Sequence, residues 1–223
     1  FYYVMELLHG IDLETLVEKY GPVPGERTAH FMLQICSSLE EAHRSGLVHR
    51  DIKPANIYAC RYGLEYDFVK VLDFGVVKST GTSSGLTQLT VADAAAGTPG
   101  FMAPEMALGA RDIDGRADIY GVGCVAYWLL TGKLVFEEET PIATILAHAH
   151  KPPVPPSRRT ELDVPPQLEK LIMSCLEKDP ERRPSTAGEI IRLLSQLDLT
   201  GSWARDSAEK RWRSPMPEKE RPR

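Results

Sequence analysis

The 223-residue chain is poor in features that several classes of protein require. Its four cysteines include no C-x-x-C pair, so we expect reduced, mostly buried thiols rather than a zinc site or a disulfide framework. Its most apolar stretch, residues 119–130, has about half of the ~20 residues that a bilayer requires, so no membrane span is predicted. A net charge of −5 lacks the basic excess of a nucleic-acid binder, so no nucleic-acid partner is expected.

No basic segment followed by an apolar run opens the chain, so no signal peptide is predicted and we expect a cytoplasmic location. The first residues, 1–5, instead have the aromatic and β-branched character of a strand interior, which indicates that more protein precedes them. Hydrophobic residues make up 43% of the chain, which is enough for one large core and too much for a disordered protein.

Residues 201–223 differ from the rest of the chain in composition. They hold seven Lys or Arg, four Asp or Glu and three prolines, with few apolar residues. We therefore predict a disordered polar tail or linker over residues 200–223. Any membrane anchor of the parent protein would lie beyond this tail.

Hydrophobic periodicity predicts a mainly helical domain of the α+β class. Helices are predicted over residues 12–17, 26–45, 104–108, 118–131, 140–150, 166–177 and 186–197. Short strands are predicted over residues 1–5, 57–60 and 68–72, the last two as a hairpin. Residues 79–96 are rich in Ser, Thr, Gly and Ala, which indicates a long mobile loop of the kind that is usually functional.

Three segments carry the chemical signal. His-Arg-Asp-Ile-Lys-Pro-Ala-Asn spans residues 49–56, Asp-Phe-Gly spans 73–75, and Gly-Thr-Pro-Gly-Phe-Met-Ala-Pro-Glu spans 97–105. In this order and at these separations, they resemble the C-terminal lobe of a eukaryotic-like protein kinase, which implies that residues 49–56 are its catalytic segment. Residues 51–56 and the proline-rich stretch 151–157 resemble the bacterial serine/threonine type.

The resemblance extends from residue 1 to about residue 195 and implies three parts. These are the last small-lobe strand with the hinge at 1–12, a kinase-like large lobe at 13–199, and the tail at 200–223. Short β-hairpins around the catalytic and metal-binding loops are implied as well. The implied activity is transfer of the ATP γ-phosphate to Ser or Thr of protein substrates.

The resemblance also implies roles for individual residues. Asp51 is the base that accepts the proton of the substrate hydroxyl, and Lys53 steadies the γ-phosphate of ATP. Asn56 and Asp73 hold Mg²⁺, or Mn²⁺ in its place, because these cations favour oxygen ligands. Thr98 contacts Asp51 and Lys53, as is typical of the serine/threonine-specific subclass.

The adenosine part of ATP would meet residues near the N-terminus. By resemblance, Met5 is the gatekeeper, the backbone carbonyl of Glu6 and amide of Leu8 meet adenine, and Asp12 faces the ribose. Tyr58 stands where the family usually has an aliphatic residue under adenine. It would either stack on the base or crowd it.

Arg50 implies regulation by a phosphate on the activation loop, because a phosphorylated residue would supply a charged acceptor for its side chain. Thr87 and Thr90 are the favoured sites, since they lie nearer the substrate-binding segment than the other candidates. A loop rich in Ser and Thr that is simply flexible accounts equally well for the pattern. A dimer would allow one copy to phosphorylate the loop of the other.

Some residues have structural roles in the resemblance. Asp118 would cap the helix that it opens and tie down the backbone of the catalytic segment. Glu105 and Arg183 would form an internal ion pair, and Phe74 would stack on His49.

The chain departs from the family because no glycine-rich loop and no strand-three lysine precede residue 1. As an isolated fragment it is therefore expected to be inactive. A non-catalytic, pseudokinase-like binding module is the alternative, but the presence of Asp51, Asn56 and Asp73 argues against it. A small-molecule kinase is a third reading, and residues 97–105 argue against that, because this segment is suited to receive a peptide.

Overall fold

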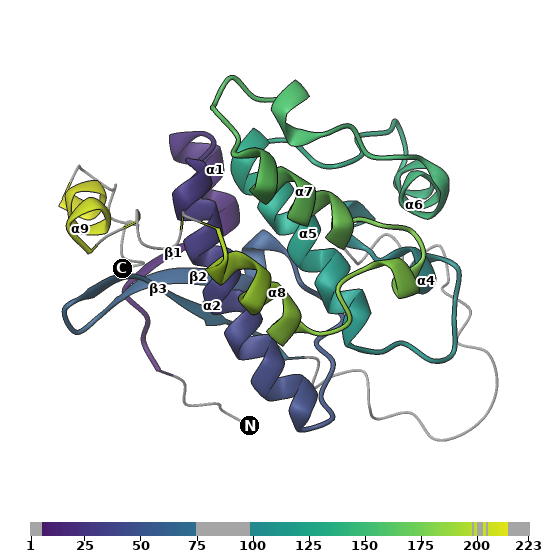
Figure 1. Ribbon diagram of the computed structural model, residues 1–223, viewed down its shortest axis with the longest axis horizontal. Helices are drawn as coiled ribbons and strands as arrows, with labels where there is room; N and C mark the ends of the chain where they lie inside the picture. Colours follow the sequence, from purple (N-terminus) through teal and green to yellow (C-terminus); the bar gives the residue numbers. More distant parts are fainter. Residues whose placement is uncertain (1–5, 75–98, 198, 200–202, 204, 214–223) are drawn as a thin grey trace, which may run out of the picture.

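The computed structural model describes residues 6–74, 99–197, 199, 203 and 205–213 (Figure 1). The strand predicted over 1–5 and the whole segment from 75 to 98 are not among them. Predictions that lie outside the described residues are the loop at 79–96 and the site residues Met5, Thr87, Thr90 and Thr98.

Helices dominate the described chain, which confirms the mainly helical α+β class. The α-helices are α1 (Leu13–Tyr20), α2 (Gly25–Arg44), α4 (Pro104–Ala107), α5 (Gly115–Thr131), α6 (Pro141–His150), α7 (Pro166–Cys175), α8 (Ala187–Ser195) and α9 (Arg205–Arg213). Short 3₁₀ turns are η1 (Pro54–Asn56), η2 (Pro99–Phe101), η3 (Pro156–Arg158) and η4 (Pro180–Arg182). The strands are β1 (Gly10–Asp12), β2 (Ile57–Tyr62) and β3 (Glu65–Val71).

Helix α5 is the centre of the core. Nearly all of its side chains are buried, and it packs between α2 and α7 (Figure 1). Gly121 on this helix lies against Ile52 of the catalytic segment, and a Cβ atom at position 121 would come within 2.8 Å of the Cβ of Ile52. The missing side chain therefore lets the catalytic segment pack directly on the most buried helix.

The three strands form one antiparallel sheet in the order β1-β2-β3. The predicted hairpin is confirmed, with Ile57 paired to Val71 at its open end. Strand β1 pairs along β2, with Gly10 opposite Cys60. The sequence pattern does not predict β1, because three residues that begin with glycine are too few to show an alternation.

The prediction that Asp118 caps the central helix is wrong. Helix α5 begins at Gly115, and its N-cap is Asp114, whose carboxylate accepts a hydrogen bond from the backbone amide of Arg116 at 2.9 Å. Asp118 lies one turn further along the helix, where it is buried. Two aspartates four residues apart look alike in sequence, and only the start of the helix decides which one caps it.

The prediction of a disordered tail is wrong for residues 205–213, which form helix α9. Two tryptophans of this region, Trp203 and Trp212, donate hydrogen bonds to the buried carboxylate of Asp67. Composition does not reveal such a contact, because the acceptor lies far away in the sequence.

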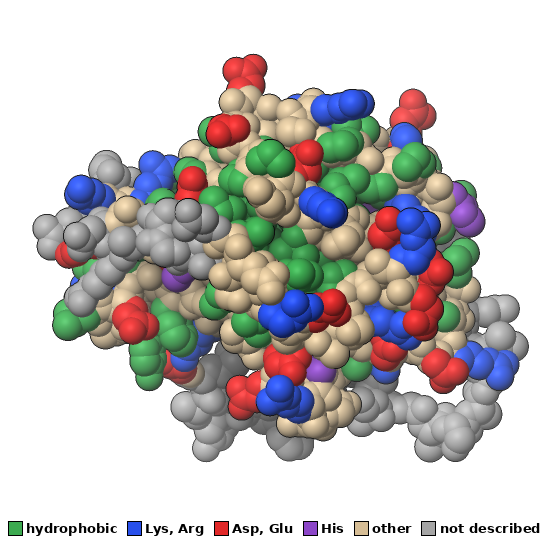
Figure 2. All heavy atoms as spheres, in the orientation of Figure 1, with side chains coloured by type: hydrophobic (Ala, Val, Ile, Leu, Met, Phe, Trp, Pro, Cys, Tyr) green, Lys and Arg blue, Asp and Glu red, His purple; other side chains and the backbone are tan. Residues whose placement is uncertain are grey.

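Acidic and basic side chains are interspersed over the described part of the face in Figure 2.

The prediction of reduced, mostly buried thiols is confirmed. All four cysteines are free and buried, and burial raises the pKa of the Cys36 and Cys124 thiols. Within the described ranges, no helix combines the length and the apolar character needed to cross a bilayer.

Candidate active site

The catalytic segment is anchored by Asp118 on α5. Its Oδ2 accepts a hydrogen bond from the backbone amide of His49 at 2.8 Å, and its Oδ1 accepts one from that of Arg50 at 2.7 Å. His43 on α2 lies 2.8 Å from the same Oδ2 through its Nε2. The predicted tie between Asp118 and the catalytic segment is confirmed. The support from His43 is not visible in the sequence, because it joins residues 75 positions apart.

Three predicted site residues come together around one carboxylate. Lys53 Nζ donates to Asp51 Oδ2 at 2.8 Å. The side-chain amide of Asn56 donates to the same oxygen at 3.1 Å and to the Asp51 backbone carbonyl at 2.9 Å. The Asp51 side chain is 50% exposed, so it is both fixed and open to a reactant.

His49 links the catalytic segment to the segment that carries Asp73. The backbone amide of Asp51 donates to His49 Nδ1 at 3.2 Å, so Nε2 carries the hydrogen and donates to the Leu72 carbonyl at 2.9 Å. The Phe74 ring lies 4.8 Å from the His49 ring between centroids, at a tilt of 57°, which confirms the predicted contact. The exposed Asp73 is thereby fixed relative to Asp51.

The donor set fits a hard divalent cation. Because the nitrogen of the Asn56 amide is directed at Asp51, its oxygen is the atom suited to bind a metal. Asp73 adds an exposed carboxylate on a backbone with φ of 58°. The described residues contain no cluster of three or more His, Cys, Asp and Glu side chains that could hold a metal. Two oxygen ligands completed by phosphate and water are typical of Mg²⁺ rather than Zn²⁺.

The protein kinase domain family matches residues 1–193 of the sequence. The chain belongs to this family. It is 38% identical over 195 residues to the serine/threonine-protein kinase pkn3 of Myxococcus xanthus, a match that covers 87% of this chain and 36% of that protein. It is 37% identical to the serine/threonine-protein kinase PknB of Mycolicibacterium smegmatis, which covers 85% of this chain and 29% of that protein.

A solved kinase structure supports the same fold. The crystal structure of Rad53 1-466 in complex with AMP-PNP matches with a TM-score of 0.66 and 26% sequence identity, over 84% of this chain and 44% of that chain. The chain spans about a third of the length of the curated relatives that it matches. The family match and the solved structure establish the protein kinase fold for this chain. The curated relatives indicate the bacterial serine/threonine type.

Three residues that are predicted to lie near the adenosine of ATP form hydrogen bonds or ion pairs within the chain. Both carboxylate oxygens of Asp12 accept hydrogen bonds from Thr15 at the start of α1. Tyr58 donates its hydroxyl to the Gly10 carbonyl at 2.7 Å, and burial raises the pKa of that hydroxyl. Glu6 pairs with Lys70 on β3. Strand β1 is thus tied to the hairpin of β2 and β3, which follows the catalytic segment in the chain.

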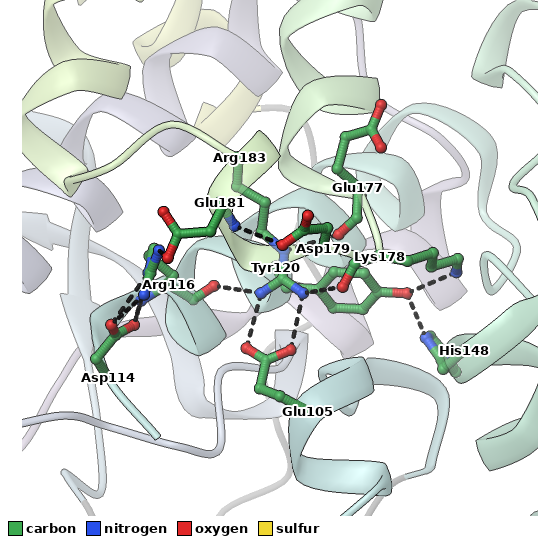
Figure 3. A network of polar contacts seen from close by, with 10 residues as sticks. All are labelled: Glu105, Asp114, Arg116, Tyr120, His148, Glu177, Lys178, Asp179, Glu181 and Arg183. Atoms are coloured by element: carbon green, nitrogen blue, oxygen red, sulfur yellow. Dashed lines mark hydrogen bonds and ion pairs between the residues drawn. The ribbon is translucent and has the colours of Figure 1, made fainter. Parts of the chain in front are cut away.

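A polar network centred on Arg183 and Tyr120 lies inside the kinase domain (Figure 3). The buried guanidinium of Arg183 donates to both carboxylate oxygens of Glu105, each at 2.8 Å, which confirms the predicted ion pair. Its remaining donors reach the backbone carbonyls of Glu177, Arg116 and Lys178. Its hydrogen bonds therefore join α4, the start of α5 and the segment between α7 and η4 at one centre.

Tyr120, His148 and Lys178 form a second part of the polar network in Figure 3. The Tyr120 hydroxyl lies 2.8 Å from His148 Nδ1 and 3.3 Å from Lys178 Nζ. Burial lowers the pKa of His148 to about 3 and that of Lys178 to about 8. The Lys178 ammonium also lies 4.4 Å from the centroid of the Phe136 ring, a cation–π contact.

Proposed function

We propose that this chain is the large-lobe part of a serine/threonine protein kinase that transfers the γ-phosphate of ATP to protein substrates. The observation that carries the proposal is the Asp51 carboxylate, which is half exposed and held by both Lys53 and Asn56. Asp51 is exposed, Lys53 is partly exposed and Asn56 is buried at the end of η1, so a covered amide and a cation together fix a carboxylate that faces solvent. Such an arrangement suits a group that must meet a reactant in one orientation.

In the proposed reaction, Asp51 accepts a hydrogen bond from the substrate Ser or Thr hydroxyl. The hydroxyl oxygen attacks the γ-phosphorus, the bond from that phosphorus to the bridging oxygen breaks, and ADP leaves. The proton of the hydroxyl passes to Asp51. Lys53, 2.8 Å from Asp51, supplies positive charge toward the transferring phosphate, where negative charge accumulates.

Asn56 and Asp73 would hold Mg²⁺, with Mn²⁺ as an alternative, through the amide oxygen and the carboxylate. When bound, the cation neutralises phosphate oxygens and so favours departure of ADP. The hydrogen bond from the Asn56 side-chain amide to the Asp51 carbonyl would fix the proposed metal ligand relative to the proposed base. The contact of His49 with Leu72 fixes Asp73 in the same way.

The proposal extends to the remaining predicted residues. Met5, Glu6, Leu8, Asp12 and Tyr58 would border the adenosine, with Tyr58 positioned by its bond to Gly10. Thr98 would complete the peptide side by contacting Asp51 and Lys53.

Regulation and location follow from the same proposal. Arg50, an exposed residue beside the base, would pair with a phosphate on Thr87 or Thr90 of the activation loop, added by a second copy of the chain. ATP as substrate places the domain in the cytoplasm. The activity requires the small lobe that the family places upstream.

The deciding experiment replaces Asp51 with Asn in the full-length protein. Transfer of phosphate from ATP to a Ser- or Thr-containing peptide should fall by about 10²-fold or more, with the thermal unfolding temperature unchanged. The matched control is Asp163→Asn, an exposed aspartate in another loop. Unchanged peptide phosphorylation in Asp51→Asn would overturn the proposal. Phosphate on a small metabolite and on no protein would replace it with a small-molecule kinase.

A further inference from the structure

A second buried carboxylate, that of Asp67 on β3, lies outside the catalytic site. On this strand Tyr66 and Asp67 together face the single residue Arg61 of β2, and Asp67 has a φ of 56°. An extra residue of this kind is a β-bulge, which redirects a side chain out of the regular alternation. Here it turns the carboxylate toward Arg27 of α2, and Asp67 is 0% exposed.

Each oxygen of this carboxylate accepts two hydrogen bonds. Oδ1 accepts from Nη2 of Arg27 at 2.8 Å and from the indole nitrogen of Trp212 at 2.8 Å. Oδ2 accepts from Nε of Arg27 at 2.9 Å and from the indole nitrogen of Trp203 at 3.0 Å. A carboxylate offers about four acceptor positions, so the set is complete. Half of it comes from residues beyond the 1–193 range that matches the kinase family.

The helix that carries Trp212 depends on this contact. Helix α9 has nine residues, most of them charged or polar, which is too short for a stable isolated helix in water. Its Ala208 is buried, and the Trp212 ring lies 6.1 Å from the ring of Tyr66 on β3. The Tyr66 hydroxyl also donates to Glu209 at 3.4 Å. Figure 1 shows α9, in yellow, beside the sheet, and α9 contacts β3.

We propose that Asp67 and Arg27 form a docking site for a pair of indole N–H groups, and that its occupant is Trp203 together with helix α9 of the same chain. The guanidinium of Arg27 orients the carboxylate and lies 5.4 Å from the ring centroid of Trp203, where it adds a cation–π contact. The docked segment is fastened to α2 and β3, so the chain after the kinase fold is held at a fixed position on the domain. This role is independent of phosphoryl transfer.

The test compares backbone hydrogen exchange in the full-length protein and in the double variant Trp203→Phe, Trp212→Phe. Phenylalanine keeps an aromatic ring and removes only the indole donors and part of the area. The control is Trp128→Phe on α5, because the Trp128 indole nitrogen is buried without a hydrogen-bond partner among the described residues. The measured quantity is the exchange rate of residues 205–213 divided by that of α2, which corrects for any general loss of stability.

This ratio should rise about tenfold or more in the double variant, because two hydrogen bonds to a charged acceptor are lost, and should stay constant in Trp128→Phe. An unchanged ratio in the double variant overturns the proposal. A tenfold to hundredfold dilution of the wild-type protein separates the two sources of the segment. Protection that survives dilution supports docking within one chain, and protection that is lost shows that a second copy supplies the tryptophans, which also overturns the proposal.

Discussion

Asp118 holds the backbone of Arg50 in a left-handed conformation. The Arg50 amide donates to Asp118 Oδ1 at 2.7 Å, and the φ of Arg50 is 63°. A non-glycine residue in this region costs about 1–3 kcal/mol, and a charge-assisted hydrogen bond offsets that cost. Asp51 follows Arg50 directly, so Asp118 sets the backbone from which the proposed base projects.

Replacing Asp118 with Asn should reduce both stability and turnover. The asparagine NH₂ group would face one of the two backbone amides, which leaves a buried donor unpaired at a cost of about 1–3 kcal/mol. Displacement of Asp51 should lower kcat more than it changes KM for the peptide. Urea unfolding and steady-state kinetics measure the two effects, and Asp112→Asn, at an exposed loop position, is the control. An Asp118→Asn variant with the wild-type kcat and urea midpoint of unfolding would show that the contact of Asp118 with the His49 and Arg50 amides is dispensable.

Replacing Arg183 with Lys should destabilise the domain by about 3–5 kcal/mol. Lysine keeps the charge but cannot reproduce the planar set of hydrogen bonds to Glu105 and to three backbone carbonyls. The urea midpoint of unfolding measures the loss. Arg192→Lys is the matched control, because Arg192 is 59% exposed and should change stability by less than about 0.5 kcal/mol. Equal midpoints for the two variants would contradict the role of Arg183.

The sequence predicts the parts of the structure that depend on local pattern or on a motif. Helices such as α2 and α7 follow from apolar periodicity, and the cluster of Asp51, Lys53 and Asn56 lies within one short segment. Asp73 follows a hairpin whose strands are visible in the sequence, and the backbone amide of the preceding Leu72 donates to the Asn56 carbonyl at 2.8 Å.

Contacts that depend on distant residues could not be predicted. Asp67 meets Arg27 across 40 positions and Trp203 across 136, and no local pattern marks either pairing. The bulge that turns Asp67 inward arises from the way in which β2 and β3 pair, and the composition of the strands does not determine that pairing. The charge, the prolines and the low apolar content of the tail predict disorder, whereas the order of helix α9 depends on Trp203 and Trp212, whose acceptor lies on β3.

Replacing Asp73 with Asn should weaken metal binding under the proposed function. One charged oxygen ligand would be lost from a site with only two protein ligands, so the Mg²⁺ concentration for half-maximal activity should rise by about tenfold or more. A readout without turnover is the Mg²⁺-dependent rise in melting temperature at fixed AMP-PNP, which should shift in parallel. Asp163→Asn again serves as the control. If the Asp73→Asn variant needs the same Mg²⁺ concentration as wild type for half-maximal activity and for the rise in melting temperature, Asp73 is not a metal ligand.

Acidification should destabilise the domain through His148. This side chain is 0% exposed, its Nδ1 lies 2.8 Å from the Tyr120 hydroxyl and it lies near the Lys178 ammonium, so protonation would bury a second positive charge beside the first. Burial lowers its pKa from 6.5 to about 3. Between these values the unfolded state binds a proton that the folded state does not, so the free energy of unfolding falls as the pH decreases through this window. The His148 contribution is fully present above pH 6.5 and lost as the pH falls to about 3.

The variant His148→Gln removes this titration and should flatten the pH dependence of stability by up to one proton, about 1.4 kcal/mol per pH unit. Carboxylates also titrate in this window, so the informative quantity is the difference between variant and wild type in urea unfolding at pH 4, 5, 6 and 7. His150→Gln, at an exposed position two residues along α6, is the control and should leave the slope unchanged. A His148 variant with the wild-type slope would mean that the buried imidazole is protonated without cost. The contact with Tyr120 would then contribute nothing to acid stability.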